Sequence, residues 1–593
     1  MNIIELKDLT YSYPATEKPV LDHISLQIEK GDFLAIVGNN GCGKSTLCKT
    51  LNGLIPHFIS GNFRGQVVVD GVDTLQSDVG NLACKAGYVY QDFENQIVRP
   101  TVLDDASYAC LNYAMDHYLE RGKEALEMCG LSGREDDYIW QLSGGQTHLL
   151  ALAGAVSLRP EVLILDEPIA QLDPGHADRI YQVLRELNEK YNKTIIVIEH
   201  HTEYIADYCK HVVLMKDGKI AWKLPVKEAL RRVEELRECN IFPPQVTVAA
   251  DRLQKQGLIR PDAALPTTIE EGLRLFEASE NKASENKTRK EDTGETAQAK
   301  TYTSVGSNEA AGSERTTEKA GEALDFSHVQ VSYRSVKGEN RRVFDDLNIR
   351  ISHGEKIALI GSNGAGKSTL MKMMVGLLKP DAGEIFLEGE TLSGKRPEQL
   401  SRHISLVYQN PEDMFIKDSI EADIAYAMQV RNVADYRERT EALLERFSLT
   451  GLRDRDGRLM SGGQMRRASL AIGVALNPRI LLLDEPTANL DIATRKEIMK
   501  TLSDMKEITD TVIIATHDMQ LVCEWADRII VLCGGNVIAD GSPDEIFSNQ
   551  KVMDHVGIRP PEIFTLARRL DKNAFCYTID DFVRTIGEER AWN

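Results

Sequence analysis

The chain has 593 residues, of which 42% are hydrophobic and 27% are charged, so it has a globular composition with room for several domains. Its net charge of -20 argues against a general nucleic-acid binder, which usually has a basic balance. The ten cysteines form no CxxC pair, which argues against a metal cluster or a disulfide framework and favours reduced thiols in the cytosol.

The N-terminal stretch MNIIELKDLTYSYP has no basic region followed by an apolar run, so we expect no secretory signal. No stretch approaches the about 18 uninterrupted apolar residues of a transmembrane helix. The sequence therefore predicts no membrane span of its own. If the protein works at a membrane, another protein must hold it there.

A glycine-rich motif, GNNGCGKST, follows the apolar run FLAIV and precedes a predicted helix, which is the context of a P-loop. Gly38, Gly41 and Gly43 let the chain curl so that backbone N–H groups point at phosphate. Lys44 can then reach the β- and γ-phosphates, and the Ser45 hydroxyl can ligate Mg²⁺. The alternative is a glycine turn followed by an incidental Lys-Ser pair.

An acidic pair ends the later apolar run 162–165. Asp166 can hold a magnesium ion through water, as a carboxylate at the end of a strand does in P-loop enzymes. Glu167 lies one step further, where a carboxylate can orient or deprotonate the attacking water. The alternative is a helix-capping feature, which the recurrence of the pair later in the chain argues against.

The chain repeats itself. GSNGAGKST begins at Gly361, the SGGQ turn at Ser143 returns at Ser461, and LILDEP returns as LLLDEP, with an offset between matched elements of 317 to 323 residues. A match of this length indicates a duplication. Lys367 and Ser368 repeat the first P-loop chemistry, and the acidic pair returns as Asp484 and Glu485.

Short apolar runs alternate with amphipathic stretches in each copy, which predicts an α/β fold. Residues 279–323, between the copies, are rich in Ser, Thr, Glu, Lys and Gly, so we expect a disordered tether. As a flexible coil it would span roughly 35–40 Å, enough to let the two copies face each other. A charged helix is the alternative, which the glycines and threonines disfavour.

The combination of P-loop, LSGGQ-like turn, LILDEP strand and downstream histidine resembles the ATP-binding cassette family over nearly the whole chain. The resemblance implies two tandem P-loop NTPase domains, each with a helical signature subdomain and a short C-terminal extension. The expected boundaries are 1–240 for the first cassette, 241–278 for its extension, 279–323 for the linker, 324–555 for the second cassette and 556–593 for its extension.

In that family, two cassettes stack head to tail, and each ATP lies between the P-loop of one and the signature turn of the other. The resemblance therefore implies that residues 143–146 contact the γ-phosphate held by Lys367, and residues 461–464 the one held by Lys44. The physics agrees, because a glycine turn that opens a helix presents N–H groups and a positive dipole end to an anion.

Other family positions carry over in pairs. Tyr13 and Tyr333 resemble the aromatic residue that stacks on adenine, although a tyrosine at a strand end is often simply packed. Gln91 and Gln409 resemble the Q-loop glutamine, which senses Mg²⁺ and the membrane partner.

The resemblance also assigns two residue pairs near the γ-phosphate. His200 and His517 follow the strands TIIVI and TVIIA and resemble the switch histidine that contacts the γ-phosphate. Asp173 and Asp491 resemble the D-loop aspartate that crosses the dimer interface.

The motifs and the resemblance together predict the following sites. The catalytic residues are Glu167, Glu485, His200 and His517. The ATP-binding residues are Tyr13, Gly38, Asn39, Asn40, Gly41, Cys42, Gly43, Lys44, Ser45, Thr46, Gln91, Ser143, Gly144, Gly145, Gln146, Asp166, Asp173, Tyr333, Gly361, Ser362, Asn363, Gly364, Ala365, Gly366, Lys367, Ser368, Thr369, Gln409, Ser461, Gly462, Gly463, Gln464, Asp484 and Asp491. The Mg²⁺ ligands are Ser45, Gln91, Asp166, Ser368, Gln409 and Asp484.

The first copy departs from the family pattern. Leu149 stands where the basic Arg467 follows the second signature, the first D-loop reads IAQLD, and Glu199 precedes the switch histidine in place of Thr516. Both catalytic glutamates and both histidines remain, so we expect two hydrolytic sites, and we expect them to be unequal in rate.

Three classes of tandem cassette compete. Translation and ribosome-recycling proteins carry a basic helical arm or an iron–sulfur domain, and DNA-repair proteins carry zinc-binding cysteine insertions; neither feature occurs here. The segments QDFENQIV and QNPEDMFI instead resemble those of energy-coupling factor transporters, the vitamin and cobalt/nickel uptake family. A conventional importer or exporter ATPase is the alternative.

The resemblance implies partners and a place of action. The chain would be both ATPase subunits fused, peripheral on the cytoplasmic face of the cell membrane. It would bind an integral membrane coupling protein, which engages a small membrane protein that captures the substrate. The apolar pairs Ile97 with Val98 and Phe415 with Ile416 would lie where the membrane partner docks, unless they are core residues. The C-terminal extensions would help to pair the cassettes.

Overall fold

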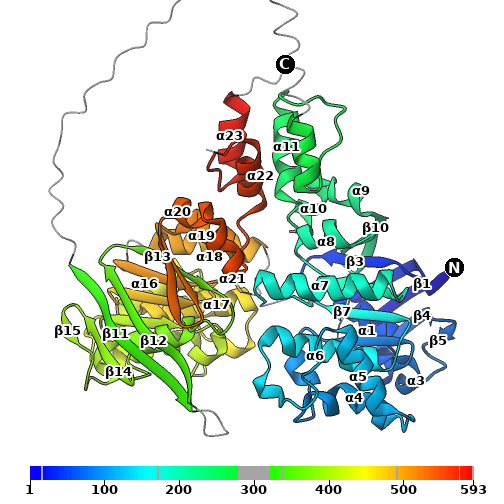
Figure 1. Ribbon diagram of the computed structural model, residues 1–593, viewed down its shortest axis with the longest axis horizontal. Helices are drawn as coiled ribbons and strands as arrows, with labels where there is room; N and C mark the ends of the chain where they lie inside the picture. The colour runs from blue at the N-terminus through cyan, green and yellow to red at the C-terminus, as the bar shows by residue number, and fades with distance from the viewer. Residues whose placement is uncertain are drawn as a thin grey trace, which may run out of the picture.

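The computed structural model of the chain consists of two similar lobes capped by a pair of helical extensions (Figure 1). It describes residues 1–14, 16, 18–169, 172–277, 321–334, 340–488, 490, 492–505, 508–572 and 574–589. The expected tether lies outside the described residues except for its last three, and so does Asp491. The second lobe begins with β11 at Glu322, two residues before the expected boundary.

The first lobe is built from ten strands and a set of helices. Its strands are β1 (Asn2–Ser12), β2 (Leu21–Glu29), β3 (Phe33–Gly38), β4 (Asn62–Val69), β5 (Val72–Asp73), β6 (Ala86–Val89), β7 (Val162–Asp166), β8 (Thr194–Ile198), β9 (His211–Lys216) and β10 (Lys219–Pro225). Its helices are α1 (Lys44–Leu51), α2 (Leu54–His57), α3 (Val79–Ala83), α4 (Val102–Asn112), α5 (Tyr118–Met128), α6 (Gly144–Ser157), α7 (Pro174–Glu189), α8 (Thr202–Tyr208) and α9 (Val226–Leu230).

The second lobe repeats this order. Its strands are β11 (Glu322–Arg334), β12 (Asn340–Ser352), β13 (Lys356–Gly361), β14 (Ala382–Leu387), β15 (Glu390–Thr391), β16 (Ile404–Val407), β17 (Ile480–Asp484), β18 (Thr511–Ala515), β19 (Arg528–Cys533) and β20 (Asn536–Gly541). Its helices are α13 (Lys367–Met374), α14 (Pro397–Leu400), α15 (Ile420–Val430), α16 (Tyr436–Arg446), α17 (Gly462–Val474), α18 (Ile492–Asp504), α19 (Met519–Trp525), α20 (Pro543–Ser548) and α21 (Gln550–Val556).

Each lobe has a six-stranded central sheet, with the order β10-β9-β3-β8-β7-β6 in the first and β20-β19-β13-β18-β17-β16 in the second. In each sheet five neighbouring strands are parallel, from β9 to β6 in the first lobe and from β19 to β16 in the second. The remaining strand, β10 or β20, lies at one edge and runs antiparallel. Every residue of β3, β7 and β8 is buried. Parallel sheets are covered on both faces, which explains why these strands are mostly apolar, apart from Thr194 at the start of β8 and Asp166 at the end of β7.

A four-stranded antiparallel sheet lies against each central sheet, in the order β2-β1-β4-β5 and β12-β11-β14-β15. On the other side, α4, α5 and α6 pack on one another in the first lobe, and α15 packs on α16 and α17 in the second. These are the helical subdomains that the sequence predicts. Short 3₁₀ turns η1 (Phe93–Gln96), η2 (Ile139–Gln141), η3 (Pro411–Met414), η4 (Thr450–Leu452) and η5 (Gly457–Leu459) connect them.

The C-terminal extensions of the two lobes pack against each other (Figure 1). The first contains α10 (Val233–Glu238), α11 (Gln245–Lys255) and a helical stretch at 269–277, and the second contains α22 (Glu562–Leu570) and α23 (Ile579–Glu589). Their shared apolar core includes Leu253 and Phe276 from one side and Leu566 and Phe582 from the other. The two extensions therefore contact each other, and their role in pairing the cassettes stays a prediction.

Candidate functional site

Each P-loop connects the central strand of its sheet to a helix, β3 to α1 and β13 to α13. Gly43 and Gly366 precede these helices at φ 103° and 104°, a left-handed conformation that favours glycine. At Gly38 a side chain has no room, because a Cβ would lie 2.3 Å from the carbonyl oxygen of Met215. The loops therefore curl as the spacing of their glycines predicts.

The P-loop lysines fold back over their own loops. Lys44 Nζ donates to the carbonyl oxygens of Gly38 at 2.8 Å and Asn39 at 3.1 Å. Lys367 Nζ does the same with Gly361 at 2.7 Å and Ser362 at 3.3 Å. Both lysines are buried, so each loop holds a positive charge beside its ring of backbone N–H groups, as binding of a polyphosphate requires.

Each P-loop serine touches the aspartate at the end of the neighbouring acidic strand. Ser45 Oγ donates to Asp166 Oδ1 at 3.3 Å, and Ser368 Oγ donates to Asp484 Oδ2 at 3.0 Å. Burial raises the pKa of both aspartates, and a bound cation would reverse that effect. A hydroxyl and a carboxylate fit Mg²⁺, which takes its remaining ligands from phosphate and water. Among the described residues no group of three or more His, Cys, Asp or Glu forms an all-protein metal site.

The glutamate that is expected to be catalytic in each lobe lies in a strained turn. Glu167 and Glu485 have φ of 50° and 46°, a region that non-glycine residues rarely adopt and that costs about 1–3 kcal/mol. The turn follows directly on the aspartate, and it aims the glutamate side chain back toward the P-loop helix and the switch histidine. Such strain is typical of functional sites.

The two glutamates have different partners. Glu167 Oε2 accepts a hydrogen bond from Gln91 Nε2 at 2.7 Å, and its Oε1 lies 3.3 Å from His200 Nε2. Glu485 Oε2 accepts from Thr516 Oγ1 at 3.1 Å and from the backbone N–H of His517 at 3.4 Å.

The electrostatics of the two glutamates differ accordingly. Burial acts to raise the pKa of Glu167, but the hydrogen bond and charge of His200 outweigh it and lower that pKa. Burial raises the pKa of Glu485 to about 7. The two glutamates, which the sequence treats as equivalent, therefore occupy unlike surroundings.

The second switch histidine contacts two residues of its own P-loop. His517 Nε2 lies 2.9 Å from Asn363 Oδ1 and 3.1 Å from Lys367 Nζ. Burial, together with the charge of Lys367, lowers the pKa of His517 to about 3. A neutral imidazole can accept a hydrogen bond from Lys367, and it is placed to turn toward a γ-phosphate when that lysine engages ATP.

The first D-loop aspartate crosses to the other lobe. Asp173 Oδ2 accepts a hydrogen bond from the backbone N–H of Asn363, in the second P-loop, at 3.2 Å. Asp173 also caps α7, where it accepts from the backbone and imidazole of His176. These hydrogen bonds lower the pKa of Asp173 well below its usual range, against the opposing effect of burial. The D-loop and the second P-loop are thus joined in one site.

The signature turns open α6 and α17. Ser143 and Gln146 form a reciprocal capping box, and Ser461 and Gln464 form the same arrangement. Gly145 is packed so tightly on His176 of α7 that a Cβ would lie 2.0 Å from that ring.

The first signature turn is therefore packed directly against the start of α7, beside the D-loop that reaches Asn363. Contact between either signature turn and the opposite P-loop is not made in the described residues, and it stays a prediction.

The expected adenine-stacking tyrosines lie beside the P-loop helices. The Tyr13 hydroxyl lies 3.1 Å from Thr46 Oγ1, and the Tyr333 hydroxyl lies 3.3 Å from Thr369 Oγ1. Tyr333 is exposed and lines the cavity described next, whereas Tyr13 is half-buried. Stacking of either ring on adenine stays a prediction.

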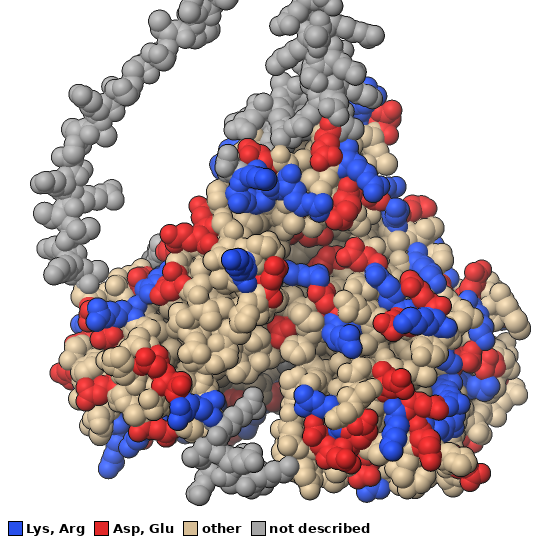
Figure 2. Space-filling model, viewed as in Figure 1, with Lys and Arg blue, Asp and Glu red and all other residues tan. Residues whose placement is uncertain are grey.

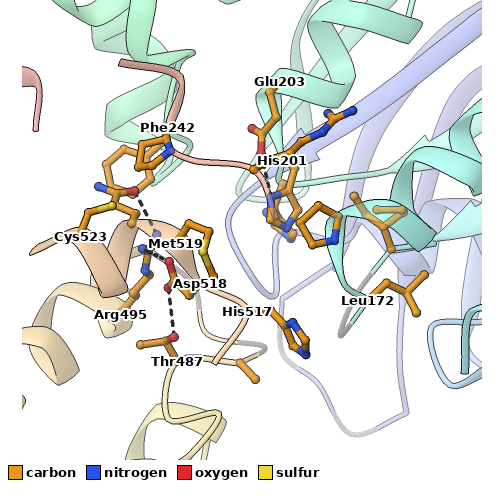
Figure 3. A pocket seen from close by; sticks show the side chains of 18 of the residues that line it. Leu172, His201, Glu203, Phe242, Thr487, Arg495, His517, Asp518, Met519 and Cys523 are labelled. Carbon is orange, nitrogen blue, oxygen red and sulfur yellow. Dashed lines mark hydrogen bonds and ion pairs between the residues drawn. The ribbon is translucent and has the colours of Figure 1, made fainter. Parts of the chain in front are cut away.

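A cavity of ≈ 2300 Å³ separates the two lobes and reaches both P-loops. Its lining includes Asn39, Glu167 and His200 from the first lobe and Lys367 and Glu485 from the second. Figure 3 shows Arg495, Asp518 and His517 of the second lobe across the cavity from His201 and Glu203 of the first. The cavity is large enough to admit nucleotide between the lobes.

The sequence patterns do not single out the residue that holds the second Q-loop. Arg466 is buried and donates to the carbonyl oxygens of Tyr408 at 3.0 Å and Gln409 at 2.7 Å, so it holds the second Q-loop. The family pattern draws attention to its neighbour Arg467, which instead pairs with Glu497. A second basic residue in MRRA is the signal that could have identified Arg466.

The chain matches a known protein family over the residues that form these sites. The profile of the family described as ABC transporter matches residues 21–170 and 344–488, which hold both P-loops, both signature turns and both acidic strands. Relatives named as ABC transporter ATP-binding proteins match nearly the whole chain at 31–32% identity. The chain belongs to the ABC transporter family.

Three relatives carry a provisional name as ABC transporter ATP-binding proteins. The relative from Methanosarcina acetivorans is 31% identical over 580 residues, covering 96% of this chain and 90% of its own length. The relative from Methanosarcina mazei is 32% identical over 582 residues, covering 97% and 95%. The relative from Clostridium perfringens is 31% identical over 591 residues, covering 98% of each.

A solved structure described as cbiO1 from Clostridium perfringens, part of the ABC transporter complex cbiONQ, is 33% identical. It covers 41% of this chain and 97% of its own, with a TM-score of 0.35. Family membership makes this ABC transporter chain an ATP-binding protein that hydrolyses ATP to ADP and phosphate, coupled to transport. Within the described part of the chain, no helix has the length and apolar character needed to cross a bilayer.

Proposed function

We propose that this chain is the fused double ATPase of an energy-coupling factor type importer for a micronutrient, a vitamin or a transition-metal ion. Mg²⁺ would accompany each ATP, held by Ser45 with Asp166 and by Ser368 with Asp484. When bound, the ion would supply positive charge to neutralise the phosphate oxygens. The chain would sit on the cytoplasmic face of the membrane, attached to an integral coupling protein that engages a small substrate-capture protein.

The observation that carries this proposal is an exposed apolar side chain just after each Q-loop. Val98 is 58% exposed and Ile416 is 60% exposed. Their neighbours behave differently, because Ile97 is half-buried and Phe415 is a core residue, so the docking role expected for Phe415 is wrong. Exposed apolar residues at matching positions of both lobes indicate a two-point docking surface.

Further apolar side chains extend this surface on each lobe. Trp140 is exposed and stacks on Tyr138, which bridges to Thr101 just beyond Val98. In the second lobe, Leu459 is exposed in η5, whose Gly457 packs against Phe415. We call Val98, Tyr138 and Trp140 the first docking surface, and Ile416 with Leu459 the second docking surface.

The visible face of the molecule shows no comparable feature for nucleic acid. Figure 2 shows Lys and Arg interspersed with Asp and Glu over that face, without an extended stripe of one sign. A nucleic-acid site would present such a stripe.

Co-purification tests the proposal. The tagged chain is expressed in its own cells, membranes are solubilised in mild detergent, and the bound proteins are identified. A multispan coupling protein together with a small hydrophobic capture protein supports the proposal, and the capture protein names the substrate class. A long multispan permease with a separate binding protein would instead identify a conventional ABC transporter.

Matched variants locate the contact. Val98→Asp combined with Ile416→Asp should lower recovery of the membrane partner at least tenfold, because each places a charge in an apolar contact. Tyr191→Asp is the control, since Tyr191 is 47% exposed but lies beyond the end of α7 that is remote from the D-loop. Equal recovery by all three chains would overturn the docking assignment.

A further inference from the structure

The residue before each switch histidine differs between the two ATP sites. In the second lobe this residue is Thr516, which is buried and donates its hydroxyl to Glu485 Oε2 at 3.1 Å. The Thr516 Oγ1 atom in turn accepts a hydrogen bond from the backbone N–H of Asp518 at 3.0 Å. A neutral hydroxyl therefore joins the catalytic carboxylate to the turn that carries His517.

Glu199 occupies this position in the first lobe, and its side chain is 2% exposed. Its Oε1 accepts hydrogen bonds from the backbone N–H groups of His200 at 2.7 Å and His201 at 2.9 Å. Its Oε2 accepts from the hydroxyl of Tyr181, on α7, at 2.9 Å. Three donors satisfy a buried carboxylate that would otherwise be destabilising, so the fold provides a dedicated place for it.

The hydroxyl that completes this arrangement is itself fixed. Tyr181 is fully buried, and its ring stacks on Tyr204 at a centroid distance of 4.9 Å. The position in α18 at the same distance from the D-loop aspartate is Met499, which has no hydroxyl. The first lobe thus has Glu199 and Tyr181 at the two positions where the second lobe has Thr516 and Met499.

The exchange redirects the turn that carries the switch histidine. In the second site the backbone N–H of His517 donates to Glu485 Oε2 at 3.4 Å. In the first site the equivalent N–H of His200 donates to Glu199 instead, and the imidazole Nε2 of His200 lies 3.3 Å from Glu167 Oε1. In the second site both the backbone N–H and the imidazole of His517 face Glu485, since His517 Nε2 lies 3.5 Å from Glu485 Oε1. In the first site the backbone N–H of His200 is taken by Glu199, so His200 reaches Glu167 through its imidazole.

We propose that Glu199, held by Tyr181, is a positioning residue of the first ATP site. It fixes the turn after β8 so that the imidazole of His200 is directed at Glu167. It touches neither ATP nor the attacking water, and it acts only through His200. The proposal depends on the ATPase activity of the family and not on which membrane partner the chain binds.

Single-turnover cleavage of ATP tests this in the full-length chain carrying Glu485→Gln, in which cleavage reports the first site. Glu199→Ala should lower the cleavage rate about tenfold, as expected for loss of a hydrogen bond to a charged group, while half-saturating ATP changes less than about twofold. Glu199→Gln keeps an acceptor oxygen for the two backbone N–H groups and should recover most of that loss. Tyr208→Phe, in the same aromatic cluster as Tyr181, should leave the rate unchanged.

A double-mutant cycle separates positioning from general packing. Glu199→Thr and Tyr181→Met each introduce the residue of the second lobe, and each should slow cleavage about fivefold to tenfold. If they act as a pair, the double variant should be no slower than either single variant. Multiplicative losses, or equal rates for Glu199→Ala and Glu199→Gln, would overturn the proposal. Thermal unfolding of each variant accompanies the rates, and the isosteric Glu199→Gln decides the question if Glu199→Ala does not fold.

Discussion

Glu167 and Glu485 directly follow the equivalent strands β7 and β17, and both have a positive φ. Their carboxylates nevertheless accept hydrogen bonds from different groups. Gln91 and His200 contact the first, and the Thr516 hydroxyl and the His517 backbone contact the second. Substitution of either should remove the carboxylate that orients the attacking water. Their surroundings predict that the two losses will not be equal.

We expect Glu485→Gln to reduce steady-state ATP hydrolysis more than Glu167→Gln, because the second site keeps the Thr-His pattern typical of the family. Each loss should be at least tenfold for the site concerned. Retained ATP binding in both variants, measured with a fluorescent analogue, is the control. Equal losses from the two substitutions would contradict the expected inequality of the sites.

His148 is another residue whose setting could not be predicted from its type. It occupies the position of Arg466, packs on Phe93 with a centroid distance of 3.4 Å, and has no hydrogen-bond partner for either ring nitrogen among the described residues. Burial lowers the pKa of His148 to about 3, from an ordinary value of 6.5. The folded chain therefore keeps this ring neutral where the unfolded chain takes up a proton.

That difference predicts an acid-sensitive contribution to stability. Above pH 6.5 neither state binds the proton, and below it the unfolded state gains one that the folded state lacks. The free energy of unfolding should fall by about 2 kcal/mol between pH 7 and pH 5 through this residue alone. His148→Leu should show a correspondingly smaller fall in thermal stability over that range, and an identical fall in both chains would exclude the effect.

Among the elements, the Q-loops show how unlike residues solve the same packing problem. The second Q-loop is fastened by the guanidinium of Arg466 to the carbonyl oxygens of Tyr408 and Gln409. The first has His148 stacked on Phe93 at the matching place. A Q-loop fastened by hydrogen bonds and one fastened by ring packing should differ in how strongly each resists deformation.

Adjacent arginines on α17 allow a matched test of this fastening. Arg466→Met leaves two carbonyl oxygens without their charged donor and should lower the free energy of unfolding by about 3 kcal/mol. Arg467→Met removes only a pair with Glu497, whose side chain is largely exposed, and should lower it by less than about 1 kcal/mol. Chemical denaturation monitors both, and similar losses would show that Arg466 does not hold the loop.

The elements that the sequence predicts well are those whose residues carry their own geometry. The P-loop glycines dictate a left-handed turn, and the run VLIL before Asp166 is apolar because both faces of the sheet are covered. The partners of Glu199 depend on the packing of α7 against β8, which no local pattern encodes. The same holds for Arg466, whose acceptors are carbonyl groups nearly sixty residues earlier in the chain.

For the molecule as a whole, contacts between lobes occur at two separate levels. Near ATP, Asp173 bonds to the backbone of Asn363. Farther away, Gln245 and α22 exchange hydrogen bonds, from the Gln245 N–H to Glu562 Oε2 at 2.8 Å and from the Ile563 N–H to Gln245 Oε1 at 3.0 Å. The lobes are therefore joined both beside the P-loops and through their extensions.

The extensions also make pseudo-equivalent contacts with unlike chemistry. Arg559, of the second extension, pairs with Asp178 on α7. At the matching place, Lys496 of α18 lies over the ring of Phe242, of the first extension, at 5.1 Å. Each extension therefore contacts the opposite lobe at an equivalent place, one through an ion pair and the other through a cation–π contact.

Leu566 offers the sharpest test of what the extension pair does. It is fully buried in the shared apolar core, and a Cβ at Gly272 of the other extension would lie 3.3 Å from its Cδ1. Leu566→Asp places a charge in that core and should separate the extensions. If each ATP needs residues from both lobes, as the family resemblance implies, ATP hydrolysis should then fall at least tenfold while each P-loop still binds nucleotide.

Leu566→Met is the control, since a volume-conserving exchange should cost less than about 1.5 kcal/mol and leave hydrolysis within twofold. Hydrolysis is measured at saturating ATP, and nucleotide binding is measured on the same samples. Full activity in the Leu566→Asp chain would mean that the linker alone supplies enough effective concentration to pair the lobes. Loss of both hydrolysis and nucleotide binding would mean instead that the core of the extensions is needed for the second lobe to fold.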